Sequence, residues 1–111
     1  MADMAAKPQE NLVMKRFRAT LTEIYGDRIE RVVLFGSRAR GDAREDSDYD
    51  VAVFLHNYAP GTTTELYRLA DLSTAILDET GEFIHAMPYR AGSYDERTPL
   101  MHEFRAEGID L

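Results

Sequence analysis

Apolar residues recur along the chain with periods that predict helices at its two ends and in its middle. The first helix begins at Asn11, where apolar positions start to recur at intervals of four, four and three, and it ends at Gly26. Its predicted core stripe comprises Val13, Phe17, Leu21 and Ile24. A last helix starts at Pro99 or Leu100, turns Leu100, Met101 and Phe104 inward, and ends at Gly108.

A longer helix is predicted between these two. Thr62 and Glu65 have the spacing of a capping box at its start, and Gly81 ends it. The residues expected on its buried face are Leu66, Leu69, Ala70, Ser73, Ile76 and Leu77. A short helix is expected at residues 38–40, followed by a charged loop at residues 41–47.

Two unbroken apolar runs, residues 32–35 and 51–55, predict central strands that are buried on both faces. The second run continues a segment that begins at Asp48, so we expect an extended strand over residues 48–55. A third strand is predicted over residues 82–89, where Pro88 marks an edge or an exit. Helices and strands in this order fit an α/β or α+β domain with helices packed on a small mixed sheet.

The length of 111 residues fits one small domain with a single core. We expect residues 1–10, which are small, polar and proline-containing, to be a flexible N-terminus, and residues 11–111 to form the domain. We expect no separate substrate domain beside this core. A catalytic function would therefore need an acceptor on another macromolecule.

The net charge of −7 and the absence of cysteine narrow the function classes. Direct nucleic-acid binding is disfavoured, because duplex-binding proteins usually present a net basic surface, and an acidic chain prefers basic partners. Without cysteine there are no disulfides or zinc-thiolate sites. No apolar run reaches transmembrane length and the first residues lack the core of a signal peptide, so we expect a cytoplasmic protein with no membrane contact.

Candidate chemistry is concentrated between residues 32 and 55. Asp48 and Asp50 lie two residues apart, so on a strand their carboxylates leave the same face about 7 Å apart. Such a pair suits Mg²⁺, which takes one or two carboxylates and fills its other positions with water and substrate phosphates. Gly36 and Ser37 directly follow the preceding strand, where a glycine lets backbone N–H groups approach a phosphate and the serine adds a donor.

Each of these features alone usually indicates turn chemistry. Their ordered combination of strand, Gly-Ser, basic segment, Asp-x-Asp and apolar strand is much rarer, and it favours a metal and phosphate site. Arg38 and Arg40 are candidates for phosphate contacts, although solvated arginines on a short helix are the commoner case.

The segment GSRARGDAREDSDYD, with ten residues between Ser37 and Asp48, resembles the signature of the minimal nucleotidyltransferases of the DNA polymerase beta superfamily. The spacing matches the antitoxin branch, whose members are the partners of HEPN toxins. The resemblance implies the polymerase-beta nucleotidyltransferase fold. It also implies that Gly36 and Ser37 hold the nucleotide triphosphate and that Asp48 and Asp50 bind two Mg²⁺ ions, with a third carboxylate on a later strand.

The predicted third strand departs from this pattern, because His85 stands where the family has the third carboxylate. In a regular strand Glu82 and His85 point to opposite faces, so only one of them can face the site. A neutral histidine can accept a proton or bind a softer metal than Mg²⁺, but it adds no negative charge. A partly buried histidine without a role is the alternative.

The resemblance implies an antitoxin that forms a hetero-oligomer with a HEPN-type ribonuclease toxin. It would neutralise the toxin by Mg²⁺-dependent transfer of AMP from ATP to a toxin hydroxyl, with tyrosine as the expected acceptor. Two alternatives stay open. A centre weakened at His85 would neutralise the partner by binding alone, or the nucleotidyltransferase would use another acceptor.

Overall fold

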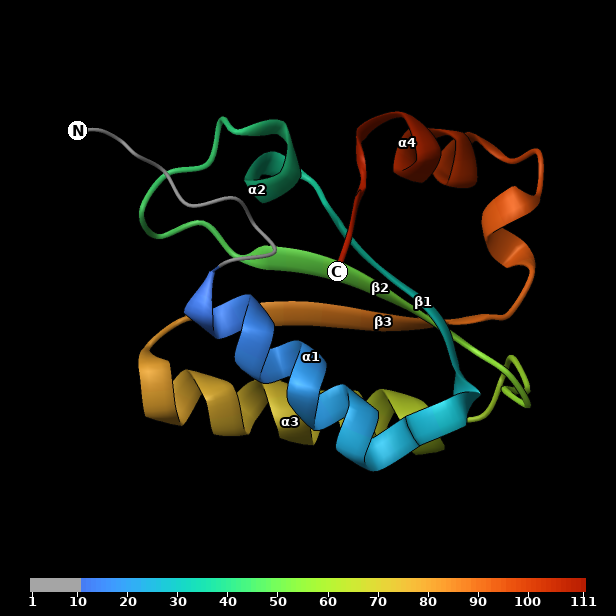
Figure 1. Cartoon of the computed structure of the whole chain (residues 1–111), viewed down its shortest axis with the longest axis horizontal. Helices are drawn as coiled ribbons and strands as arrows, with labels where there is room; N and C mark the ends of the chain where they lie inside the picture. Colours follow the sequence, from blue (N-terminus) through green and yellow to red (C-terminus); the bar gives the residue numbers. More distant parts are fainter. Residues whose placement is uncertain (1–10) are drawn as a thin grey trace.

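The computed structural model describes residues 11–111, and the predicted flexible segment at residues 1–10 lies outside the described part (Figure 1). Four α-helices, four strands and two short 3₁₀ turns follow one another among the described residues. In chain order they are α1 (Leu12–Tyr25), η2 (Gly26–Arg28), β1 (Ile29–Phe35), α2 (Ser37–Arg40), β2 (Tyr49–Leu55), α3 (Thr64–Thr80), β3 (Ile84–Arg90), η3 (Ser93–Asp95), α4 (Pro99–Glu107) and β4 (Ile109–Asp110).

The four strands form one mixed sheet in the order β3-β2-β1-β4. β1 pairs antiparallel with β2, which brings Phe35 opposite Asp50, and β2 pairs parallel with β3, which brings Asp50 beside His85. The predicted α/β domain with a small mixed sheet is therefore confirmed. β4 was not predicted, because a two-residue strand has no periodicity of its own and exists only through its pairing with β1.

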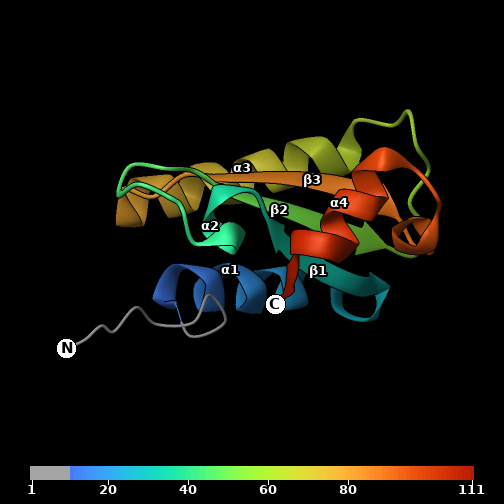
Figure 2. The same cartoon turned by 90° about the horizontal axis from the view of Figure 1, so that it is seen from above.

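Helices cover both faces of the sheet. α1 and α3 lie side by side on one face and α4 lies on the other (Figures 1 and 2). Side chains on the first face include Phe17, Leu34 and Ile76, whereas Phe54 and Phe104 belong to the second. Each fully buried side chain of this size contributes about 1.5–3 kcal/mol relative to an exposed one, so both faces stabilise the sheet.

The core stripe of α1 differs from the predicted one. Its buried residues are Met14, Phe17, Leu21 and Tyr25, whereas Ile24 is exposed. The helix is rotated because its start is tied down: the N–H groups of Val13 and Met14 donate to the Asn11 side chain, whose amide donates to the Tyr49 hydroxyl at 3.0 Å. The predicted limits of the helix, Asn11 and Gly26, are correct as its two caps.

α3 ends at Gly81 as predicted, but the predicted capping box is wrong. The helix is capped by Thr63 without a side-chain hydrogen bond, and the Thr62 hydroxyl donates to Ala59 O. Glu65 is instead buried, where Arg28 pairs with it at 3.0 Å. Of the predicted stripe, Leu69, Ser73 and Ile76 are buried together with Leu72, while Leu66, Ala70 and Leu77 remain exposed.

The strand boundaries move by a few residues. β1 begins at Ile29 rather than at Val32, and β2 begins at Tyr49, so Asp48 immediately precedes the strand. Pro88 lies in an edge strand, as predicted. In α4 Met101 and Phe104 face the core, but Leu100 is exposed. No helix within residues 11–111 has both the length and the apolar character needed to cross a membrane.

Candidate active site

The turn after β1 is built against the side chain of Asp50. Gly36 has φ 75° and ψ −159°, a conformation that only glycine adopts readily. A Cβ atom at Gly36 would lie 2.6 Å from Asp50 Oδ2, closer than real Cβ contacts come. Both the backbone conformation and the space therefore require glycine at this position, and the Gly36-Ser37 turn is held directly beside a carboxylate.

Asp50 projects from the face of the sheet that α4 covers. Its strand neighbours of the same parity, Ala52 and Phe54, pack with Phe104 in the core of that face. Tyr49 points the other way and is buried in the core formed with α1 and α3. Asp48 is exposed immediately before β2, so the two aspartates flank a residue that anchors the start of the strand.

His85 is on the same face as Asp50. The two residues are paired in the β2/β3 register, and His85 Nδ1 lies 3.6 Å from Asp50 Oδ1. Tyr89, which has the parity of His85, stacks on Phe54 with ring centroids 5.4 Å apart, so this face of β3 continues the face of Asp50. The His85 side chain is 56% exposed and hence accessible to a ligand.

Glu82 lies in the turn before β3, so the predicted start of this strand at residue 82 is wrong. Its carboxylate is 3.7 Å from Arg38 Nη2. Arg38 in turn lies over the Tyr49 ring, which points to the other face of the sheet from Asp50. Glu82 and His85 therefore have different partners. No local pattern predicts the contact between Glu82 and Arg38, because it depends on how the turn at Gly81 directs the chain.

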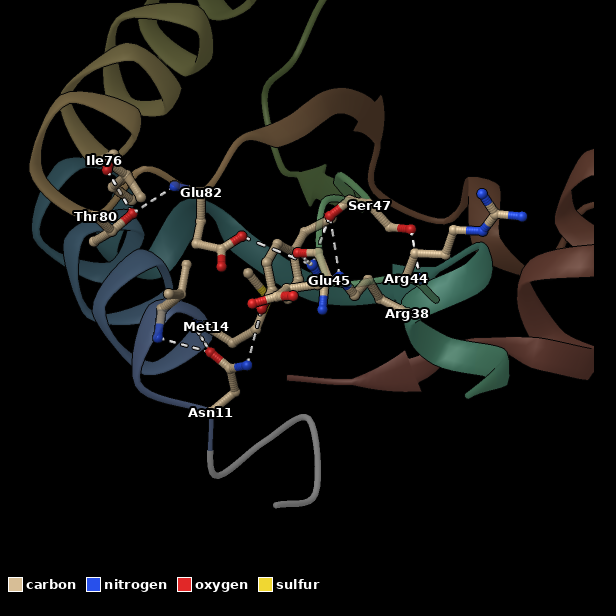
Figure 3. Close-up of polar contacts among 11 residues, drawn as sticks. Asn11, Met14, Arg38, Arg44, Glu45, Ser47, Ile76, Thr80 and Glu82 are labelled. Atoms are coloured by element: carbon tan, nitrogen blue, oxygen red, sulfur yellow. Dashed lines mark hydrogen bonds and ion pairs between the residues drawn. The ribbon is translucent and has the colours of Figure 1, made fainter. Parts of the chain in front are cut away.

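Arg38 is the centre of the polar contacts around this loop (Figure 3). Its guanidinium donates to Ser47 O from Nε at 3.1 Å and from Nη2 at 2.7 Å, and Nη2 also donates to Glu45 O at 3.1 Å. The same group lies over the Tyr49 ring, 4.3 Å from its centroid. The side chain is only 19% exposed. Arg38 thus ties the loop that carries Asp48 to α2.

Arg40 has a different set of partners. Its guanidinium pairs with Asp42 at 3.2 Å and with Glu107 of α4 at 3.3 Å. These hydrogen bonds, first the one with Asp42 and then the one with Glu107, raise the pKa of Arg40. Both arginines that the sequence singled out for phosphate contacts are therefore engaged with protein groups.

The loop before Asp48 forms one wall of a hollow of about 710 Å³. The opposite wall is the turn at residues 81–83, and the lining includes Ser47 and Asp48. Ser47 shapes the loop, because its hydroxyl accepts a hydrogen bond from the Arg44 N–H at 2.8 Å. The volume of the hollow falls in the range of about 300–1,000 Å³ that is usual for ligand pockets.

Residues 20–103 match the family model described as polymerase beta, nucleotidyltransferase. The match includes the Gly36-Ser37 turn, both aspartates and His85.

This chain belongs to the polymerase-beta nucleotidyltransferase family.

Two relatives of this nucleotidyltransferase come from Methanocaldococcus jannaschii, and each carries the name putative protein adenylyltransferase. One is 33% identical over 78 residues, which are 70% of this chain and 71% of the relative. The other is 44% identical over 43 residues, which are 39% of this chain and 43% of the relative. The stronger identity thus covers less than half of that relative's length.

Two solved structures have the same fold as this nucleotidyltransferase. A putative nucleotidyltransferase from Sulfolobus solfataricus matches with a TM-score of 0.56, and the match covers 88% of this chain and 75% of the Sulfolobus chain. A chain of a toxin-antitoxin structure with AMP-PNP matches with a TM-score of 0.60, and the match covers 86% of this chain and 70% of that chain. Both are 17% identical to it, and at that identity they confirm the predicted nucleotidyltransferase fold.

Proposed function

We propose that this nucleotidyltransferase transfers AMP from ATP to a hydroxyl group on a partner protein. The observation that carries the proposal is the packing of Gly36 against Asp50, with His85 in register on the next strand. This arrangement joins a phosphate-type turn, a carboxylate and a group that can accept a proton at one point of the sheet.

The donor set fits Mg²⁺. Asp48 and Asp50 would hold the ion through hard carboxylate oxygens, and both side chains are accessible enough to leave positions for water and phosphate. Residues 11–111 contain no group of three His, Cys, Asp or Glu side chains that could hold a metal ion. When bound, the ion neutralises charge on the phosphates.

The protein's own groups would position the reactants. Gly36 lets the turn pass directly beside the Asp50 carboxylate, and Ser37 adds a hydroxyl donor for a substrate phosphate. An acceptor hydroxyl oxygen attacks the α-phosphorus, the bond to pyrophosphate breaks, and the His85 imidazole takes the proton of the hydroxyl. Most of the acceleration would come from positioning and electrostatics.

We propose a HEPN-type toxin as the partner and a tyrosine as the expected acceptor. The ten-residue spacing between Ser37 and Asp48 supports this branch of the family, and a toxin-antitoxin structure shares the fold. The names of both relatives support a protein as the acceptor. A net charge of −7 favours a basic partner such as a ribonuclease.

Co-expression with the product of the neighbouring gene tests the proposal. A stable complex is expected, and mass spectrometry of the partner should show added AMP. Asp48→Asn and Asp50→Asn should each abolish the added mass while the fold is kept, since each removes a charge whose main partner is metal. Asp27→Asn is the matched control, because Asp27 is an exposed carboxylate in η2, before the start of β1. Unchanged transfer by either site variant rejects the proposal.

A second function is favoured by His85 itself. Without a third carboxylate, the same surface would neutralise the partner by contact, with no turnover. A complex that relieves toxicity but carries no added AMP would establish this binding function. A chain that neither binds nor protects would instead be a nucleotidyltransferase with another acceptor.

A further inference from the structure

The outer edge of β3 borders an exposed apolar groove beside the candidate active site. β3 is the last strand of the sheet, and no other strand of residues 11–111 pairs with its outer edge. Between this edge and α3 lies a groove of about 470 Å³ whose lining includes Leu66, Tyr67, Phe83 and His85. Tyr67 is 67% exposed, although it is a large aromatic residue. Exposed apolar surface next to a reactive site indicates a binding surface.

The backbone of β3 leaves hydrogen-bonding groups on this edge. At the two ends of the β2/β3 ladder, Tyr49 N–H donates to Phe83 O at 3.0 Å and Ala91 N–H donates to Leu55 O at 2.9 Å. The backbone N–H and C=O groups of successive strand residues point alternately to the two edges of the strand. Between these ends, the backbone groups of odd-numbered residues therefore point toward β2, and those of even-numbered residues point outward. Ile84 and Ala86 therefore direct their N–H and C=O groups away from the sheet.

Pro88 limits this edge. It occupies an outward-facing position, where it leaves the ladder to β2 intact but has no N–H to offer a further strand. Pairing is thus confined to the half of β3 that contains Ile84 and Ala86. These two residues flank His85, whose side chain lies beside Asp50.

A strand added here would lie about 4.8 Å from β3, the usual spacing in a sheet. Its residue next to His85 would project over the same face of the sheet as His85 and Asp50. A long hydroxyl-bearing side chain at that position, such as tyrosine, would extend toward the site. The neighbouring residues of the added strand point to the opposite face, where the groove beside α3 can receive apolar side chains.

We propose that the acceptor protein docks by adding an extended, hydroxyl-bearing segment to β3 at Ile84 and Ala86. This mode rests on the proposed AMP transfer. Asp71 and Asp78 are exposed one helical turn beyond Tyr67 and Thr74 of the groove, and no ion pair with them forms within residues 11–111. Their charge favours basic residues in the docked segment, whereas a second copy of this acidic chain would be repelled.

Amide hydrogen exchange by NMR tests the docking directly. The probe is a blocked peptide in which alternating valine and lysine residues surround a central tyrosine. We expect saturating peptide to slow exchange at the Ile84 and Ala86 amides about tenfold, because these amides would become hydrogen-bonded. The same peptide with N-methyl groups along one backbone edge cannot pair and should give no protection.

Two substitutions separate backbone pairing from the groove. Ala86→Pro removes an N–H that points to the outer edge of β3, the edge to which Pro88 also faces. It should weaken peptide binding about tenfold. Leu66→Gln should also weaken peptide binding about tenfold, because it places a polar side chain in the apolar groove. Leu77→Gln is its matched control, since Leu66 and Leu77 are 37% and 39% exposed on α3 but only Leu66 lines the groove. If Ala86→Pro does not fold, the leucine pair decides.

Several results would overturn the docking mode. These are protection at another surface, equal binding of the N-methylated peptide, and equal losses in the two leucine variants. Protection of Ile84 and Ala86 that grows with protein concentration alone would assign the edge to a second copy. Mg²⁺-dependent ATP binding, followed in the same samples at Gly36 and Ser37, separates the two ideas. Nucleotide binding without peptide protection rejects only the docking, whereas protection without nucleotide binding rejects AMP transfer and keeps the groove as a peptide site.

Discussion

A single missing side chain defines the candidate active site at the scale of residues. Gly36 brings the backbone after β1 against Asp50, and any larger residue would occupy the space of the carboxylate oxygen. This contact joins positions fourteen residues apart in the sequence. It also explains why a Gly-Ser turn and an Asp-x-Asp pair act together here, although each is common alone.

Gly36→Ala should destabilise the domain and weaken Mg²⁺-dependent ATP binding. The unfavourable backbone conformation costs about 1–3 kcal/mol, and the added methyl group must displace Asp50. Urea unfolding and calorimetric titration with Mg²⁺-ATP measure the two effects. Gly41→Ala is the control, because Gly41 also has a positive φ but nothing lies within 4 Å of its Cβ position. Equal loss of nucleotide binding in both variants would count against the site.

His85→Asp should strengthen Mg²⁺ binding and lower stability in metal-free buffer. It places a third carboxylate beside Asp50, where like charges repel unless a dication neutralises them. Mg²⁺ titration at constant ionic strength should show at least about a tenfold tighter midpoint. His102→Asp introduces the same charge on an exposed part of α4 and should leave the midpoint unchanged. No change in His85→Asp would mean that this side chain does not take part in the metal site.

At the scale of elements, the loop before β2 depends on one side chain of α2. Arg38 supplies donors to two carbonyl groups of the loop and covers the Tyr49 ring, so the short helix and the loop move as one unit. The planar guanidinium suits this role, since it can donate in several directions and stack at the same time. We therefore propose that Arg38 positions Asp48, while its contact with a phosphate stays a prediction.

Arg38→Lys should loosen the loop without unfolding the domain. A lysine retains the charge but cannot reproduce the hydrogen bonds to Glu45 O and Ser47 O together with the stacking. We expect faster amide exchange at Ser47 and Asp48 and about tenfold weaker Mg²⁺-ATP binding, with less than about 1 kcal/mol lost in global unfolding. Arg44→Lys, in the same exposed loop, should change neither. If both variants behave alike, the loop is not held by Arg38.

At the scale of the whole molecule, a buried polar cluster joins the first helix to the third. Glu65 is paired with Arg28, and its carboxylate lies beside the buried hydroxyl of Tyr25. Burial, and secondarily the Glu65 carboxylate, raise the pKa of Tyr25. Arg28 also donates to two carbonyl groups after β2, so the cluster connects α1, α3 and the sheet.

Alkaline unfolding should depend on Tyr25. Because the pKa of Tyr25 is higher in the folded than in the unfolded chain, its contribution to stability is complete below about pH 10 and declines as the pH rises further. Tyr25→Phe removes this dependence, so its free energy of unfolding should fall less between about pH 9 and pH 11. Tyr67→Phe, at an exposed tyrosine of α3, should follow the wild-type curve. Identical curves for all three proteins would reject the assignment.

The local elements and the outline of the site follow from the order of residues along the chain. Periodicity and glycine positions were enough to predict the helices and the three longer strands, and the pairing of Gly36-Ser37 with Asp48 and Asp50 indicated the nucleotidyltransferase family. These inferences succeed because they depend on short-range backbone preferences and on residues close together in the chain.

Which face of each element packs against which neighbour becomes visible only in the folded chain. The inward face of α1, the burial of Glu65, the pairing of β4, the contacts of Arg38 and the outward edge of β3 all depend on segments far apart in the sequence. Periodicity reports that a helix has an apolar side, but the angle at which it packs follows from its partners. The same holds for an arginine, whose charge is encoded locally while its hydrogen bonds are set by the chain that folds around it.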